Sequence, residues 1–257
     1  MFDSFASKGF YSIELLINLN SFGFIREGCR VLGVCFDEEQ VMEDLVEYDS
    51  TQLIPDKKSK DALDKIAGGD YWVEIIERKR NGITNAYEAE AEFAEAYCKR
   101  LRQSYTYVLN MPLRIKKGQV PKYRMIHATN HADGALIMVD NIFGRWELMK
   151  NIQSEGQQSL FEENADNEIV DREKIREQVN EHLSKVTVRT RLNPLMADFY
   201  CTYGVVCRTS VVKEFYKCLE SNGKIEVCRT PAKTPTGRAT TFFTDEKGKI
   251  VELRWKK

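Results

Sequence analysis

The side chains best suited to bind a partner are basic residues in the last quarter of the chain. Residues 185–257 hold 15 lysines and arginines against 7 acids, a net charge of +8, whereas residues 1–184 hold 23 against 32, a net charge of −9. Such a basic module is typical of nucleic-acid binding, because lysine and arginine neutralise phosphates. A solvated basic face is the alternative. The candidate nucleic-acid-binding residues are Arg208, Lys213, Lys217, Arg229, Lys233 and Arg238.

Three further residues could take part in catalysis or ligand binding. Thr129 and His131 flank an expected junction between a strand and a helix, where backbone N–H groups can bind an anion. Capping and turn formation are the alternative role for both residues. Asp3 is either the cap of a frayed helix or the tip of a strand at the carboxyl edge of a parallel sheet, where open α/β folds bind ligands.

Other site chemistries find little support in the sequence. Three histidines and seven scattered cysteines do not form a four-ligand metal motif, and neither GxxxxGK[ST] nor GxGxxG occurs. The cysteines are odd in number and irregularly spaced, which indicates a reducing compartment. No apolar run approaches the ~18 residues of a membrane span, and the N-terminus lacks the pattern of a signal peptide. We therefore expect a cytoplasmic protein without a membrane partner.

Length and composition favour a folded chain with more than one part. The 257 residues, 42% hydrophobic and 11% aromatic, correspond to between one and two domains of ordinary size. Apolar spacing predicts a helix over 10–18, and the run from Val31 to Phe36 predicts a buried strand that ends at Asp37, the cap of a following helix. Helices are expected over 60–67 and 85–103, and two antiparallel strands over 105–115 and 123–129.

The second half of the chain alternates charged and apolar segments. Asn130 is expected to cap a helix over about 131–150, followed by an acidic linker at 151–170 and a polar helix at 171–184. Thr209 can cap a helix that ends at Asn222-Gly223. A hairpin follows, with arms at Lys224 to Arg229 and about Thr240 to Trp255. Short helices before a hairpin with a basic loop are typical of a winged helix-turn-helix module, which we expect over 185–257. Other small α+β modules share this pattern.

Four sequence blocks resemble the second half of the three-Cys-motif partner protein (TcmP) family over about residues 1–150. The blocks are FDSFASKGFYSIELLINL, RVLGVCF, ALDKIAGGDYW and YRMIHATNHADGALIMVDNI. The matching positions are Asp3, Phe5, Lys8, Gly9, Glu14, Leu15, Gly68 or Gly69, Trp72, Ala128, Thr129, His131, Gly134, Met138 and Asp140. Two positions depart from the family pattern, with Ser4 in place of proline and Ala6 in place of glycine.

The resemblance implies a fold, a cofactor and partners. The fold would be α/β, with a partial Rossmann-like sheet of the class I methyltransferase type at 1–150, an acidic linker and helix at 151–184, and the winged helix at 185–257. A full-length family member would use S-adenosylmethionine (SAM), but the segments that bind it would precede Met1, so we expect no SAM site in this chain. Asp3, Thr129 and His131 would stand at the catalytic positions.

Two functions are considered in the light of this resemblance. The first is a methyltransferase-fold component that works beside a radical-SAM three-Cys-motif partner in nucleic-acid modification or repair. The second is a non-catalytic DNA-binding or adaptor protein that docks a partner enzyme.

Overall fold

The computed structural model describes residues 13–36, 57–113, 123–155 and 171–256, except for the side chains of 149–155. These residues form a mixed α/β structure with two three-stranded sheets, as the sequence indicates at the level of fold class. The chain divides into two compact units, Met1–Ala128 and Thr129–Lys257, here called unit 1 and unit 2. The positions of Asp3, of Asp37 and of most of the expected acidic linker lie outside the described residues.

The first sheet joins the start of unit 1 to its end. Its order is β1-β3-β2, and the strands are antiparallel. In the register of β1 with β3, Leu15 pairs with Ala128 and Leu19 with Arg124. The strands are β1 (Leu15–Leu19), β2 (Tyr107–Leu113) and β3 (Tyr123–Thr129).

Two predictions near the start of unit 1 are wrong. The helix expected over 10–18 is a strand from Leu15, in which Leu15, Ile17 and Leu19 are more buried than their neighbours and so alternate with a period of two. The strand expected from Val31 is instead the end of a helix, α2 (Ser21–Val31), followed by a turn with Gly33 at φ 65°. Short apolar runs fit both periods, and pairing with β3 decides between them.

The other helices of unit 1 agree with the sequence. The capping box of Asn85 and Glu88, in which each side chain accepts from the other's backbone N–H, explains why the long helix begins after Asn85. The predictions over 60–67 and 85–103 are confirmed, and a short helix between them is added. The helices are α3 (Lys57–Ala67), α4 (Trp72–Arg80) and α5 (Ala86–Leu101).

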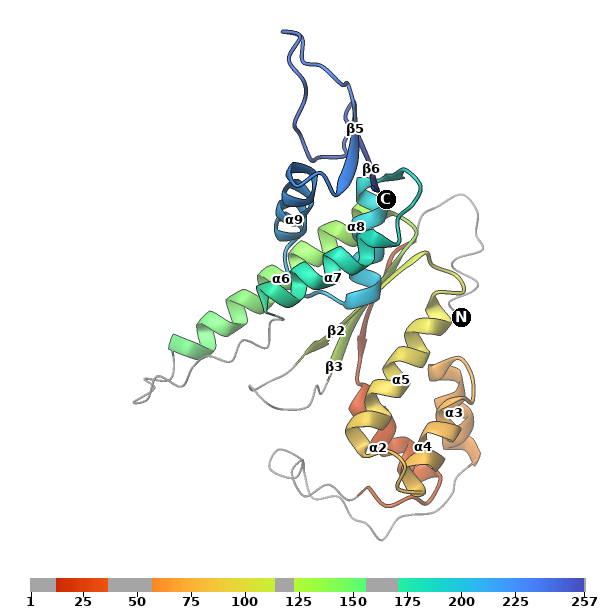
Figure 1. Cartoon of the computed structure of the whole chain (residues 1–257). Helices are drawn as coiled ribbons and strands as arrows, with labels where there is room; N and C mark the ends of the chain where they lie inside the picture. Colours follow the sequence, from red (N-terminus) through yellow and green to blue (C-terminus); the bar gives the residue numbers. More distant parts are fainter. Residues whose placement is uncertain (1–12, 37–56, 114–122, 156–170, 257) are drawn as a thin grey trace. The chain divides into compact units, whose positions relative to one another are not determined.

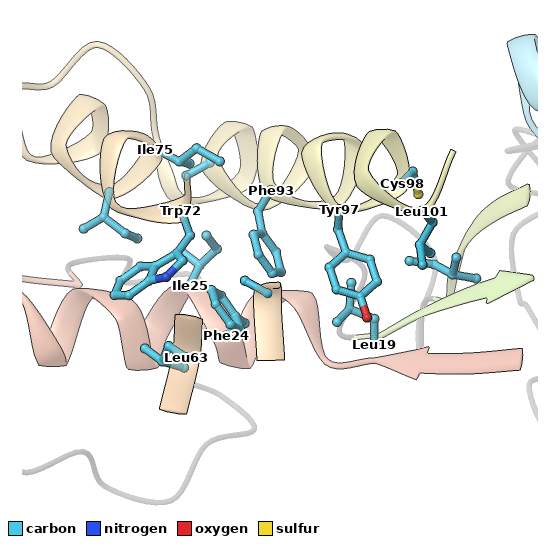
Figure 2. Close-up of a cluster of buried hydrophobic side chains, with 14 of the residues drawn as sticks. Leu19, Phe24, Ile25, Leu63, Trp72, Ile75, Phe93, Tyr97, Cys98 and Leu101 are labelled. Carbon is cyan, nitrogen blue, oxygen red and sulfur yellow. The ribbon is translucent and has the colours of Figure 1, made fainter. Parts of the chain in front are cut away.

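Aromatic side chains hold the helices of unit 1 together. Phe93 of α5 stacks on Phe24 of α2 with their ring centroids 4.0 Å apart, and Trp72 of α4 meets Phe24 edge to face. Figure 2 shows Phe93 pointing from α5 toward Phe24 of α2, and Tyr97 pointing toward Leu19 at the end of β1. Trp72 is fully buried, and its indole N–H donates to Asp64 of α3 at 2.8 Å. This packing fixes the four helices relative to one another (Figure 1).

Unit 2 begins with a long helix and ends with a hairpin. Its sheet has the order β4-β6-β5, with β6 paired antiparallel to both neighbours. The chain between β5 and β6 extends well beyond the helices of the unit (Figure 1). The elements are α6 (Ala132–Glu155), α7 (Arg172–Ser184), β4 (Thr190–Arg191), α8 (Leu192–Tyr203), α9 (Thr209–Ser221), β5 (Ile225–Thr230) and β6 (Ile250–Trp255).

The main sequence predictions for unit 2 are confirmed at the level of elements. The polar helix after 171, the helix after Thr209 and the closing hairpin are all present. The helix predicted over 131–150 continues to Glu155, so the first residues assigned to the acidic linker are helical. Both α6 and α7 belong to unit 2, whose boundary falls before Thr129 rather than near residue 150.

Candidate functional site

One face of α9 is exposed along the whole helix. Val212, Tyr216 and Leu219 are buried and form the inner face, as the apolar spacing predicts, whereas Phe215 is half-buried. Lys213 is half-buried and Lys217 is exposed, and since they lie four residues apart they share one side of the helix. The exposed positions are Ser210, Glu214, Lys217, Cys218 and Ser221.

Both acidic residues of α9 are paired with arginines from unit 2. Glu214 accepts from Arg172 of α7 at 2.6 Å, and Glu220 accepts from both terminal nitrogens of Arg229. In the part of the chain that the structure describes, neither Lys213 nor Lys217 has an ion-pair partner. The net effect is a positive field over α9, because its negative charges are neutralised inside the unit.

Two of the six basic candidates have a structural role. The guanidinium of Arg229 is only 10% exposed, donates to Glu220 and to the carbonyl of Phe242, and lies over the ring of Phe243. Arg208, the residue before α9, pairs with Glu147 of α6 and lies over Phe143. The sequence could not show this difference, since the partners lie between 9 and 61 residues away.

The loop after β5 presents the remaining two candidates. Lys233 and Arg238 are both exposed in a narrow turn, in which Lys233 pairs with Ala239 and Thr234 pairs with Arg238. Thr234 and Thr240 hold this turn: the N–H of Thr234 donates to the carbonyl of Arg238 at 2.8 Å, and the hydroxyl of Thr240 donates to the carbonyl of Pro231 at 2.8 Å. The loop is therefore hydrogen-bonded internally, which leaves its basic side chains facing solvent.

Three carboxylates of α6 contact the rest of unit 2. Asp133, Asp140 and Glu147 are seven residues apart and so lie near one face of the helix. Asp133 accepts from Asn193 at the start of α8, and Glu147 pairs with Arg208. Asp140 accepts from both the N–H and the hydroxyl of Thr209, at 2.9 and 2.7 Å. The heptad spacing of acids is visible in the sequence, but it does not show what they bind.

Asp140 acts as an external cap of α9. The predicted cap residue, Thr209, is the first residue of the helix, and Arg208 before it makes no capping hydrogen bond through its side chain. The carboxylate of Asp140 takes the role that a serine or aspartate side chain plays at an ordinary helix start.

Loss of this cap should destabilise unit 2. We expect Asp140→Ala to lower the free energy of unfolding by about 1–2 kcal/mol, because the N–H of Thr209 and its buried hydroxyl lose their acceptor. Glu147→Ala is the matched control on the same helix. It breaks a pair that is about 40% exposed on both sides and should cost about 0–1 kcal/mol. Urea unfolding measures both, and equal losses would contradict the capping role of Asp140.

Of the three residues predicted for catalysis, the structure describes Thr129 and His131, which form a turn at the start of α6. Thr129 is fully buried, and its hydroxyl accepts from the N–H of His131 at 3.0 Å, which is the turn-forming role. His131 is exposed and directly precedes α6, where its carbonyl accepts from Ala135, so it stands at the cap position that we expected for Asn130. Asp3 lies outside the described residues, and its expected role stays a prediction.

Several titratable side chains in packed positions have shifted pKa values. Burial raises the pKa of the Cys207 thiol to about 11, and Cys207 lies 3.8 Å from the hydroxyl of Tyr200. A hydrogen bond with His182 at 2.9 Å lowers the pKa of Asp198. Burial lowers the pKa of His127, whose Nε2 faces Glu14 at 3.5 Å. Cys207 and Asp198 belong to one packed region of unit 2, in which Tyr216 interacts with both, whereas His127 lies in β3. These shifts follow from burial and local pairing.

Among the described residues there is no group of three or more histidine, cysteine, aspartate or glutamate side chains placed to hold a metal ion. The helices in the described ranges include none that is long and apolar enough to cross a membrane. Comparison of the chain with protein-family models, curated proteins and solved structures finds no match. The basic surface formed by α9 and the β5–β6 loop is thus the candidate functional site, defined by Lys213, Lys217, Lys233 and Arg238.

Proposed function

We propose that unit 2 contains a winged helix that binds duplex nucleic acid. The order α7, β4, α8, α9, β5, β6 and the strand order β4-β6-β5 support this fold. The helix pair α8 and α9 is joined by a short connection with Gly204 at φ 80°, which is typical of helix-turn-helix motifs. In this proposal α9 is the recognition helix and the β5–β6 loop is the wing.

The observation that carries the proposal is the distribution of ion pairs around α9. Both acids of the helix are neutralised by arginines, while Lys213 and Lys217 are left to face a partner. Lys233 and Arg238 add two more exposed charges on the loop. A polyanion gains most from such a surface, because each neutralised phosphate releases counterions.

For unit 1 we propose the role implied by its resemblance to the TcmP family. In that reading the unit is part of a methyltransferase-type α/β domain that acts on the nucleic acid held by unit 2, beside a radical-SAM partner. The order β1-β3-β2 is compatible with the antiparallel edge of such a sheet. The absence of a SAM site from this chain, and a cytoplasmic location, stay predictions.

A native cysteine offers a direct test of the interface. Cys218 is exposed on α9 directly after Lys217, so bound duplex should cover it. We expect saturating duplex DNA to slow alkylation of Cys218 by about tenfold or more, because a specific interface excludes reagent from its centre. Peptide mass spectrometry after a short pulse with iodoacetamide measures the rate at each cysteine.

Two other cysteines serve as internal controls in the same sample. Cys35 is exposed in unit 1 and should react at the same rate with and without DNA. Cys207 is buried with its pKa raised to about 11, and it should react slowly throughout. Unchanged reactivity of Cys218 under conditions where DNA is bound would place the interface elsewhere.

A further inference from the structure

The outward face of α9 carries few groups that can distinguish bases. The helix, TSVVKEFYKCLES, contains no arginine, asparagine or glutamine. Arginine contacts guanine, and asparagine or glutamine contacts adenine, through paired hydrogen bonds in the major groove. Of the residue types that make such contacts, α9 holds only lysine, which also contacts guanine. The exposed polar groups are instead two hydroxyls, Ser210 and Ser221, the Cys218 thiol, Lys217 and Glu214, and Lys213 is half-buried.

The one exposed acid of α9 has a partner already. Glu214 could accept a hydrogen bond from cytosine, but it is paired with Arg172, whose guanidinium also lies over the ring of Phe215 at 5.4 Å. Lysine ammonium groups act as point charges and suit phosphate oxygens of any sequence. The helix is therefore equipped to bind the nucleic-acid backbone rather than to read a sequence.

The shape of the exposed face favours one form of duplex. Exposed positions run from Ser210 to Ser221, so one face of the helix is open to a partner along its whole length. A helix of ~10–12 Å diameter fits the major groove of B-form DNA, which is ~12 Å wide. The major groove of A-form RNA is deep and narrow and does not admit such a helix.

The loop supplies a different kind of contact. Arg238 is the only arginine between β5 and β6, its side chain is exposed, and no hydrogen bond to its guanidinium occurs among the described residues. Arginine side chains favour narrow minor grooves, where the negative potential is strongest, and A·T-rich DNA has the narrowest. The minor groove separates A·T from G·C pairs but gives little further sequence information.

We infer that unit 2 selects B-form duplex DNA by its shape and charge, rejects duplex RNA, and distinguishes sequences only by A·T content through Arg238. This inference rests on the proposed nucleic-acid-binding function and names its substrate class. The ligand is thus double-stranded DNA of mixed sequence, not a specific operator and not a structured RNA.

The first experiment compares duplexes that differ only in sugar. The full chain is titrated, by fluorescence anisotropy at one fixed salt concentration, with a duplex about two helical turns long made as DNA and, in the same sequence, as RNA. We expect the DNA duplex to bind at least about tenfold more tightly. Two unrelated DNA sequences of equal base composition should agree within about threefold, because phosphate contacts do not depend on sequence.

The second experiment isolates Arg238 with a variant that keeps its charge. We expect the wild-type chain to bind an A-tract duplex about three- to tenfold more tightly than a G·C duplex of the same length. Arg238→Lys should remove this preference while leaving the salt dependence unchanged, because lysine keeps the phosphate contact but enters narrow minor grooves less readily. Lys233→Arg is the matched control and should keep the preference.

The possible outcomes test the preference for B-form DNA separately from the proposed binding of duplex nucleic acid. Equal binding of RNA and DNA duplexes, or a difference above about thirtyfold between DNA sequences of equal composition, would overturn the inference and leave nucleic-acid binding intact. An A·T preference that survives Arg238→Lys would overturn the role of the loop. Failure to bind any duplex, with Cys218 unprotected, would overturn the proposed function itself.

Discussion

Replacing Lys213 and Lys217 together with alanine should weaken duplex DNA binding by the full chain about tenfold or more near physiological salt. The two ammonium groups share one side of α9 and have no ion-pair partner in the described chain, so they are available to phosphates. Each lost phosphate contact should also reduce the slope of log affinity against log salt by about 0.9, and the pair by about 1.8. A salt series with wild-type and variant chains measures both quantities.

The loop pair should behave in the same way. Lys233→Ala/Arg238→Ala removes two exposed charges from the β5–β6 loop, and we expect a similar loss of affinity and of slope. Lys65→Ala/Lys99→Ala is the matched control, because it removes equal charge from exposed positions on α3 and α5 of unit 1. If the control lowers the slope as much as either pair, net charge explains the binding and the proposed interface is wrong.

Arg229 is not part of this test. Its guanidinium is nearly buried between Glu220 and Phe243, so its replacement would disturb the packing of β5 against α9. A loss of binding in an Arg229 variant would not distinguish a DNA contact from a damaged fold.

The second large effect concerns the stability of unit 1. Removal of the Glu90 carboxylate should lower the free energy of unfolding by about 3–5 kcal/mol. Glu90 is 1% exposed in α5 and binds the 13% exposed Arg124 of β3 through both oxygens, at 2.5 and 2.7 Å. It also accepts from the hydroxyl of Ser21, which is fully buried. Glu90→Ala leaves the Arg124 charge in the interior, where among the described residues it keeps a hydrogen bond to Asn110 at 3.5 Å.

Two variants make this prediction specific. Glu77→Ala removes an exposed partner of Arg80 and should cost about 0–1 kcal/mol, since surface pairs contribute little. The double variant Glu90→Leu/Arg124→Met should recover most of the loss, because two apolar side chains replace a buried pair without leaving a charge. Urea unfolding followed by far-UV circular dichroism measures all three. A Glu90→Ala loss no larger than that of Glu77→Ala would show that Arg124 reaches solvent on its own.

The buried pair illustrates what the sequence could not predict. Glu90 and Arg124 are separated by 34 positions, and each stands in a segment whose periodicity is satisfied without it. Only the packing of α5 against the first sheet brings them together. The same holds for Asp140 and Thr209, which are 69 positions apart and fix the start of α9.

Local sequence signals were sufficient to predict an element where capping or turn residues mark its ends. Asn85 with Glu88 marks the start of α5, and Asn222 with Gly223 marks the end of α9, since Gly223 adopts φ 69°. The first hairpin arm and the basic loop after it also follow from spacing and turn residues, whereas the second arm begins at Ile250 and not at about Thr240 as predicted. These features depend on contacts within a few residues, and so the sequence alone determined them.

Tertiary structure decided the rest. Leu15–Leu19 became a strand because β3 offers an antiparallel partner, although the same apolar residues fit a helix. The six basic candidates were equivalent in sequence, and the fold divided them: Arg208 and Arg229 found carboxylates within unit 2, while Lys213, Lys217, Lys233 and Arg238 stayed available to a partner. Charge composition fixes how much positive charge the module holds, but only the fold determines which of those charges are neutralised internally, because ion pairs form between residues that are distant in sequence.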